Sequence, residues 1–577
     1  MSSLLPFLRD QIDSQEDEIL LATARGLAKI VPSIVSGADC APILDILESL
    51  LGVEETVVRQ GAIDTAKHVV SHCPPAQSPR LVSMFKNLAA QEWFTGRVSA
   101  CGVFPAVYSN ASEDAAAMAE ILGIFKGLAA DETPMVRRAA ALALGEAAKA
   151  VGADVAATEI CPLFQKLQED EAGSVRELVG ANTSAIATVV EDPGKTSSIV
   201  LPTFKLCCED KSWRVRKVAA KGYAEVTEAI FGKGGDLPGA AQTTLIECYT
   251  QLLRDPEAEV RGCAALNISK VLSISWSAGG ESVFKESIAP SLDDLSKDST
   301  MDVRAKLAQA LMEVASPSNP SVSDDTTIAV IRPIISAMLS NEEESDEVKN
   351  YILSKLPMLG KLLKSMDEVV AIVKGLSKYD QNWRTRESVA RTLPAIAEAY
   401  GIEKFAAGQD SYLSLWMGLL ADQAASVRMS CVEGMYKIYS VAAADPATSS
   451  DPSSWVTKNV LDTLKPQYDS STFYLTRITI LALYNELCHD GSVPPALART
   501  VATALVAALS DPVANVRTAA ARHLLECMPH CGDDICNGVI KSAVKETGDR
   551  IDLDKDEVMD PDHDTRDFLK KINAMMD

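Results

Sequence analysis

Apolar residues recur along this chain at the spacing of helices. Runs such as VRRAAALALGEAAKAV (136–151) and VRTAAARHLLECM (516–528) place apolar residues at i, i+3, i+4 and i+7, which predicts amphipathic helices. A second apolar run precedes each polar turn, for example APSLDDLSKD (289–298). Strict alternation of apolar and polar residues is rare, and aromatic residues make up 5% of the chain. We therefore expect helices and little β-structure.

The turns share a seven-residue frame, Asp-x-x-x-x-Val-Arg. Partial copies of the frame end at Arg59, Arg97, Lys349, Arg386, Arg477 and Arg566. From Arg97 to Arg566 the spacing averages about 43 residues, a period typical of paired-helix repeats. Full copies pair Asp131 with Arg137, Asp170 with Arg176, Asp210 with Arg216, Asp255 with Arg261, Asp298 with Arg304, Asp422 with Arg428, and Asp511 with Arg517.

Each repeat is predicted to be a helix A, a tight turn that carries the Asp, and a helix B. One such pair cannot bury its own apolar faces, so the pairs must stack. The prediction is an all-α fold, a single α-solenoid over residues 1–577 with about 14 units. We expect the longer inserts 316–327 and 442–454 to be surface loops.

Prolines give the expected helix starts. Three frames open with Asp-Pro, at 255–256, 511–512 and 560–561, and this predicts Asp as N-cap with Pro in the first helical position. Helix A is expected to start near Pro162, Pro202, Pro290 and Pro333.

The variable positions of the frame carry the candidate binding residues. Most are small or polar, but four turns carry pairs of larger residues. Each ring could fold back on its own helices, or it could contact a partner. We favour partner contact, because Trp and Arg are enriched in binding hot spots. The four pairs are Trp93-Phe94, Trp213-Arg214, Trp383-Arg384 and Phe473-Tyr474.

The charge of the chain narrows the class of partner. With 55 Lys and Arg against 79 Asp and Glu, the formal charge is −24 over 577 residues. A chain this acidic is poorly suited to nucleic acid or to an anionic membrane, so we expect neither. Neither a signal peptide nor a membrane span is recognisable. The 13 cysteines, among them Cys101, Cys161, Cys263 and Cys431, are expected to be free thiols in a cytoplasmic protein, with the nucleus also open.

Catalytic and metal-binding patterns are weak. His68 and His72 are four residues apart on a helix, but no third ligand is near in the sequence. The best metal candidate is the group Cys527, His530, Cys531 and Cys536, yet structural zinc sites usually show two regular pairs, and Cys527 continues an apolar helical face. We find no phosphate-binding loop and no nucleophile elbow. We therefore predict a protein that is not an enzyme and holds no metal or cofactor.

Several long motifs carry a family resemblance. VEETVVR (53–59), DETPMVRRAAA (131–141), DKSWRVR (210–216), WRTR (383–386) and SDPVANVR (510–517) resemble, in order along the chain, the HEAT-repeat scaffold (A, or structural) subunit of the type 2A serine/threonine phosphatase. In HEAT-type repeats the frame Asp and Arg pair between neighbouring units. The family has fifteen repeats, and this chain is expected to begin inside the second. The turn STFYLTR has Ser471 in place of the frame Asp.

The resemblance implies a non-catalytic scaffold that forms heterodimers and heterotrimers. Its N-terminal half, residues 1–310, would bind exchangeable regulatory subunits, and its C-terminal half, residues 365–577, the phosphatase catalytic subunit. The implied contacts to regulatory subunits are Trp93, Phe94, Thr133, Pro134, Arg137, Arg138, Trp213 and Arg214. The implied contacts to the catalytic partner are Trp383, Arg384, Tyr474, Arg477 and Val513.

A second hypothesis is a cargo-binding solenoid of the nuclear-transport kind, since acidic α-solenoids also do that work. Such receptors are usually longer, and they are not expected to share the turn motifs above. Phosphatase activity that co-purifies with an inactive chain would separate the two hypotheses.

Overall fold

The computed structural model describes residues 4–14, 16–34, 41–190, 193–231, 239–274, 279–316, 318–355, 373–378, 381–408, 411–446, 448–488, 493–544 and 562–576. Within these ranges the regular structure is helical and no strand occurs. The chain divides into two compact units, Met1–Ala310 and Leu311–Asp577.

Unit 1 contains the helices from α1 to α21, the last of which runs past the end of the unit at Ala310. Their bounds are α1 (Leu4–Asp13), α2 (Asp17–Ile34), α3 (Ala41–Leu51), α4 (Thr56–His72), η1 (Pro75–Gln77), α5 (Ser78–Ala89), α6 (Phe94–Asn110), α7 (Ala115–Leu128), α8 (Pro134–Val151), α9 (Ala153–Val155), η2 (Ala156–Ile160), α10 (Cys161–Gln168), α11 (Gly173–Val189), α12 (Pro193–Lys195), η3 (Thr196–Val200), α13 (Leu201–Cys208), α14 (Trp213–Lys221), α15 (Tyr223–Phe231), α16 (Gly239–Leu253), α17 (Ala258–Leu266), α18 (Ile268–Leu272), α19 (Gly280–Val283), η4 (Phe284–Ile288), α20 (Ala289–Ser296) and α21 (Met301–Ala315).

Unit 2 contains the remaining described helices. Their bounds are α22 (Asp324–Thr326), η5 (Thr327–Ile331), α23 (Arg332–Ser340), α24 (Asp346–Lys355), α26 (Trp383–Tyr400), α27 (Ile402–Ala406), α28 (Tyr412–Leu419), α29 (Ala425–Glu433), α30 (Met435–Ala444), α31 (Pro452–Val456), η8 (Thr457–Leu461), α32 (Asp462–Ser470), α33 (Tyr474–Glu486), α34 (Pro495–Ala508), α35 (Ala514–Cys527), η9 (Met528–His530), α36 (Asp533–Ile535), η10 (Cys536–Ile540) and α38 (His563–Met576).

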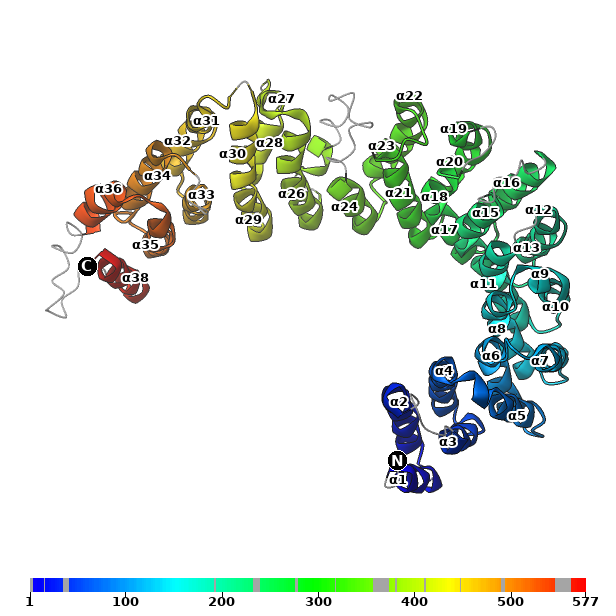
Figure 1. Ribbon diagram of the computed structural model, residues 1–577. Coiled ribbons are helices and arrows are strands. Elements are labelled where there is room, and N and C mark those ends of the chain that lie inside the picture. The colour runs from blue at the N-terminus through cyan, green and yellow to red at the C-terminus, as the bar shows by residue number, and fades with distance from the viewer. Residues whose placement is uncertain are drawn as a thin grey trace. The chain divides into compact units, whose positions relative to one another are not determined.

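Within each unit the helices form two stacked layers. In unit 1 the B helices α2, α4, α6, α8, α11, α14 and α17 pack in that order, and the A helices α3, α5 and α7 pack beside one another (Figure 1). In unit 2 the B helices α24, α26, α29, α33, α35 and α38 pack in that order. Apolar side chains fill the space between the layers, for example Phe104 of α6 stacked on Phe125 of α7 with ring centroids 4.1 Å apart. The predicted paired-helix stack, an α-solenoid, is confirmed.

The frame Asp does not cap helix B. In the two described Asp-Pro turns the N-cap residues are Glu257 and Val513, two positions after Asp255 and Asp511. Each Asp instead accepts a hydrogen bond at 2.9 Å from the backbone N–H of that N-cap residue, which closes an Asx turn. The predicted Asp cap is therefore wrong, because the carboxylate stabilises the turn before the helix. The third Asp-Pro, 560–561, lies outside the described residues.

The prolines expected near the start of helix A are the second residues of α10, α13, α20 and α23, as predicted. In four repeats a five-residue π-helical turn, η2, η3, η4 or η5, ends two residues before the proline, and the α-helix then continues. Proline lacks an N–H, and its ring clashes with the carbonyl four residues earlier. The wider π-turn relieves this mismatch without ending the helix. The prolines are Pro162, Pro202, Pro290 and Pro333.

The two inserts are shorter as loops than the sequence suggested. Residues Asp324–Thr326 form α22, and the Ser323 hydroxyl accepts a hydrogen bond from the Thr326 N–H at 3.3 Å. Residues 442–444 belong to the end of α30, and α31 begins at Pro452 after the N-cap Asp451. N-capping side chains therefore extend the helices into both inserts.

Candidate protein-binding surface

Ion pairs join neighbouring repeats at five successive frames of unit 1. In the most buried example, Arg176 Nε donates to Asp210 Oδ2 at 2.7 Å and Nη2 donates to Oδ1 at 3.0 Å. Both side chains are only 6% exposed. We call each such pair a rung. The others in this unit are Arg97–Asp131, Arg137–Asp170, Arg216–Asp255 and Arg261–Asp298.

Each rung also holds its own turn. Arg176 Nη1 donates to the carbonyl oxygens of Asp170 and Glu171, at 2.6 and 3.1 Å, in the turn that precedes its helix. Asp210 Oδ1 accepts in addition from the Ser212 N–H at 2.8 Å. The guanidinium and the carboxylate thus have several partners each, which is what a buried ion pair needs to offset its desolvation.

The electrostatics of the rungs follow from this bonding. Burial alone would raise the pKa of Asp210, but hydrogen bonds from Arg176 and the Ser212 N–H, together with the positive charge of Arg176, hold it below its ordinary value. The pKa values of Asp170 and Asp298 are lowered in the same way. The hydrogen bond to Asp210 raises the pKa of Arg176 against its burial. Both partners therefore stay charged at neutral pH.

Unit 2 has rungs at Arg386–Asp422 and Arg477–Asp511. Arg477 donates from Nη2 to Asp511 Oδ1 at 3.1 Å, while its Nε lies 2.9 Å from Oδ2 without an aligned N–H. Between them the frame Asp is replaced by Ser471. There the buried Arg428 donates from Nε to the Thr479 hydroxyl at 3.1 Å, so a neutral hydrogen bond stands in place of the ion pair.

Six of the eleven large apolar side chains that are exposed in the described residues lie at the N-termini of B helices. Trp93 is 70% exposed, Phe473 53%, Met135 49% and Trp383 40%. All four are the N-cap residue or one of the first two residues of their helix. We call these places the turn positions. Val57 and Met301 are two further exposed residues at turn positions.

The two Trp-Arg turns have the same geometry. Trp213 and Trp383 are the first residues of α14 and α26. The guanidinium carbon of Arg214 lies 4.8 Å from the Trp213 ring centroid, and that of Arg384 lies 4.7 Å from Trp383. A cation over the ring face stabilises the ring at the surface. Trp213 is half-buried and Trp383 is exposed, so Trp383 presents more free surface.

The structure separates the predicted contact residues into two groups. Trp93, Pro134, Arg138, Arg214, Trp383 and Arg384 are exposed, and Phe94, Trp213, Tyr474 and Val513 are half-buried at turn positions. Three others also make bonds between neighbouring repeats: Arg137 binds Asp170, Arg477 binds Asp511, and the Thr133 hydroxyl accepts from Arg97 Nη2 at 3.1 Å.

Sequence reasoning missed Val57, Met135 and Met301, because it searched the variable positions only for aromatic residues and arginine. Their signal was present, since each is a large aliphatic residue two or three positions before a frame Arg. At those positions a side chain belongs to the first turn of helix B and points away from the core.

The residues that the sequence offered for a metal site do not form one in the described part of the chain. His72 Nδ1 lies 2.8 Å from the His68 carbonyl oxygen, and the two rings are 4.5 Å apart. No group of three or more His, Cys, Asp or Glu among the described residues has metal-binding geometry, which covers Cys527, His530, Cys531 and Cys536. The described cysteines are free, as predicted, and most are buried. No described helix meets the length and hydropathy needed to span a bilayer.

Comparison with curated proteins points to one family. The chain is 32% identical over 357 residues to the beta isoform of the human serine/threonine-protein phosphatase 2A 65 kDa regulatory A-subunit, covering 62% of this chain and 57% of the human protein. It is 47% identical over 155 residues to the beta isoform of the Rattus norvegicus protein, covering 26% and 25% of the two chains. To the Schizosaccharomyces pombe PP2A regulatory A-subunit it is 34% identical over 229 residues, covering 39% and 38%. These matches span less than two thirds of each relative's length.

A family described as PPP2R1A-like HEAT repeat matches residues 240–318. Among solved structures, Kap95p, from work on the switch loops of RanGDP, superposes with a TM-score of 0.59 at 14% identity and covers 93% of this chain and 67% of Kap95p. Importin beta superposes with a TM-score of 0.53 at 12% identity, with the same coverage of 93% and 67%. At such low identity these structures show the shared helical-repeat fold alone.

Proposed function

Because the chain is a HEAT-repeat relative of the PP2A 65 kDa regulatory proteins, we propose that it is the non-catalytic scaffold of a type 2A serine/threonine phosphatase. The observation that carries the proposal is the set of exposed residues at the turn positions. Trp93, Met135, Trp383 and Phe473 remain open to solvent in a chain whose other large apolar side chains are mostly buried. Exposed apolar groups of this kind mark protein-binding surfaces.

The turn positions are suited to binding because they stand on rigid supports. The rung Arg386–Asp422 anchors the turn of Trp383 through bonds of 2.6 and 3.0 Å, and the side-chain oxygen of Asn382 accepts from the Arg384 N–H at 3.0 Å. A fixed aromatic side chain loses little entropy when a partner covers it. Each Trp is therefore a good anchor residue.

The two units are assigned different partners. In unit 1, Trp93, Phe94, Pro134, Arg138, Trp213 and Arg214 would contact a regulatory subunit that selects substrates. In unit 2, Trp383, Arg384, Tyr474 and Val513 would contact the catalytic subunit. Tethering both subunits on one chain raises the local concentration of substrate at the active site, without any chemistry from the scaffold.

Trp383→Ala is the direct test of the catalytic contact. The full chain is expected to lose about 2 kcal/mol or more of binding free energy for a PP2A catalytic subunit, because an exposed Trp anchor is removed. Binding is measured by biolayer interferometry, and helical content by circular dichroism. Met429→Ala is the matched control, since Met429 is similarly exposed, at 43%, but lies beyond the turn in α29.

Unchanged affinity of Trp383→Ala for the catalytic subunit would contradict the assignment, as would an equal loss in Met429→Ala. Trp93→Ala and Trp213→Ala should weaken the binding of a regulatory subunit but spare that of the catalytic one. The purified chain should show no phosphatase activity of its own and should capture activity in a pull-down. Phosphatase activity intrinsic to the chain would overturn the scaffold role.

A further inference from the structure

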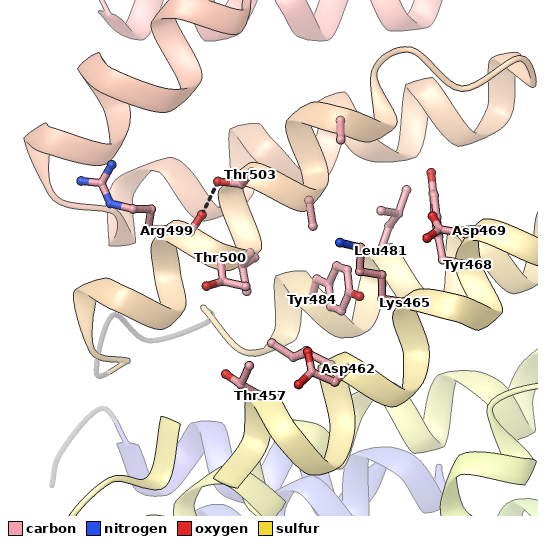
Figure 2. Close-up of a pocket in the computed structure, with 14 residues that line it drawn as sticks. Thr457, Asp462, Lys465, Tyr468, Asp469, Leu481, Tyr484, Arg499, Thr500 and Thr503 are labelled. Atoms are coloured by element: carbon pink, nitrogen blue, oxygen red, sulfur yellow. Dashed lines mark hydrogen bonds between the residues drawn. The ribbon is translucent and has the colours of Figure 1, made fainter. Parts of the chain in front are cut away.

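A cavity of about 500 Å³ opens in unit 2, away from the turn positions. One wall is formed by η8 and α32 and the opposite wall by α34, while residues of α33 form the floor (Figure 2). Its volume lies within the range of pockets that enclose small organic molecules.

The cavity exists because α34 presents small side chains toward α32. Thr500, Thr503, Ala504 and Ala507 face the space, and none of them is long enough to reach across it. The floor is formed by Leu481 and Tyr484 of α33, which gives the cavity an apolar base.

The hydroxyl of Tyr484 is a polar group at the apolar base of the cavity. The side chain is 7% exposed, yet its hydroxyl has no hydrogen-bond partner among the described residues. Figure 2 shows the Tyr484 ring among Leu481, Asp462 and Lys465. The hydroxyl oxygen is not among the fully buried unpaired atoms, so it stays open at the cavity, where a bound molecule would supply a hydrogen-bond partner.

The charges around the hydroxyl are mainly negative. Asp462 and Asp469 of α32 line the cavity and are exposed. Burial, with the negative charges of Asp469 and Asp462, raises the pKa of Tyr484 to about 12. Lys465 lies between the two carboxylates on a flexible stem at the exposed rim, and Arg499 extends away from this group.

We propose that this cavity binds a small organic cation with an apolar, ring-sized body. The body would cover Leu481, Ala504 and the Tyr484 ring, whose face attracts a cation. The ammonium would lie toward Asp462 and Asp469 and hydrogen-bond the Tyr484 hydroxyl. An anion of the same shape would meet two carboxylates, so the site discriminates by charge.

The first measurement compares two probes of one shape on the full chain, at fixed ionic strength. Phenylbutylammonium is the cation and phenylpentanoate is the anion, each titrated by ligand-detected NMR. The cation is expected to saturate with a Kd of about 0.1–3 mM, in line with its size. The anion should bind about tenfold more weakly or not at all. Equal binding of both probes, or no saturable binding of the cation, would overturn the proposal.

Variants then locate the bound cation. Asp462→Asn combined with Asp469→Asn should weaken it about fivefold or more, and Tyr484→Phe about three- to tenfold. Ala504→Trp, which fills the cavity, should abolish saturation. The matched control is Asp293→Asn, an exposed acid of α20 in unit 1, which should bind as the parent does. Unchanged affinity in the double Asn variant would place the cation elsewhere, and this would refute the site even if Tyr484→Phe folded poorly.

Discussion

Unit 1 and unit 2 use the same frame but join their repeats differently. In unit 1, five consecutive joints from Arg97–Asp131 to Arg261–Asp298 carry a rung. In the described part of unit 2, the joint after Arg428 is made by the Thr479 hydroxyl. The difference comes from one residue, since Ser471 stands where the next Asp would be. Each joint therefore has or lacks its buried ion pair according to its own residues, and the helices stack in both cases.

The two kinds of joint should respond very differently to loss of the arginine. Arg176→Met leaves Asp210 buried and without its counter-ion, which is expected to cost about 3–5 kcal/mol. Arg428→Met removes a buried guanidinium whose hydrogen-bond acceptors, the Thr479 hydroxyl and two backbone carbonyls, are neutral, so its cost should be smaller. Urea unfolding, with hydrogen exchange resolved by peptide, measures both. Equal destabilisation by the two substitutions would contradict the distinction.

Restoring the missing rung should stabilise unit 2. Ser471→Asp gives Arg428 a carboxylate partner equivalent to the one that Asp422 gives Arg386 in the preceding joint. We expect the free energy of unfolding to rise by about 1–2 kcal/mol, the net contribution of a charge-assisted hydrogen bond after desolvation. Hydrogen exchange should slow in α29 and α33. Ser471→Ala is the control, because it removes the hydroxyl without adding charge, and it should not slow the exchange.

As the pH falls, the rungs of unit 1 should lose stability while the α29–α33 joint, made by Arg428 and Thr479, is still intact. Asp170, Asp210 and Asp298 have pKa values lowered from 3.8 by their rungs. A lowered folded-state pKa contributes stability that is present above the unfolded value and is lost as pH falls through the folded value. Unfolding followed from pH 6 downward should therefore show the loss below about pH 4. Similar acid sensitivity of the α29–α33 joint, which lacks the Asp, would contradict this cause.

The smallest effect is expected where an ion pair also joins neighbouring repeats but lies in solvent. Lys86 of α5 lies 2.5 Å from Glu120 of α7, and both side chains are about half exposed, at 46% and 49%. Lys86→Ala should change stability by about 0.5 kcal/mol or less, because water screens the pair. Chemical denaturation of Lys86→Ala and Arg176→Met, measured side by side, makes the comparison. If both substitutions lowered the free energy of unfolding by a similar amount, burial would not be what sets the contribution of an ion pair.

Much of the fold could be predicted from the sequence, and less of the site. The frame around Arg176 and Asp210 was readable because each repeat encodes its own helix pair within about 43 residues. The bonds from Arg97 to the Thr133 hydroxyl and from Arg428 to the Thr479 hydroxyl were not, since the two partners lie 36 and 51 residues apart along the chain.

The sequence by itself determined the order of the helices, the repeat period and the chemistry offered at each turn, because these depend on residues close together in the chain. Only the tertiary structure decided how those residues are used. It turned the frame Asp from a helix cap into a turn bond and a rung, placed a π-turn directly before the helix that begins with Cys161 and Pro162, and left Trp213 half-buried but Trp383 exposed. Those outcomes depend on packing against the neighbouring repeat, where burial and competing hydrogen-bond partners set the lowest free energy.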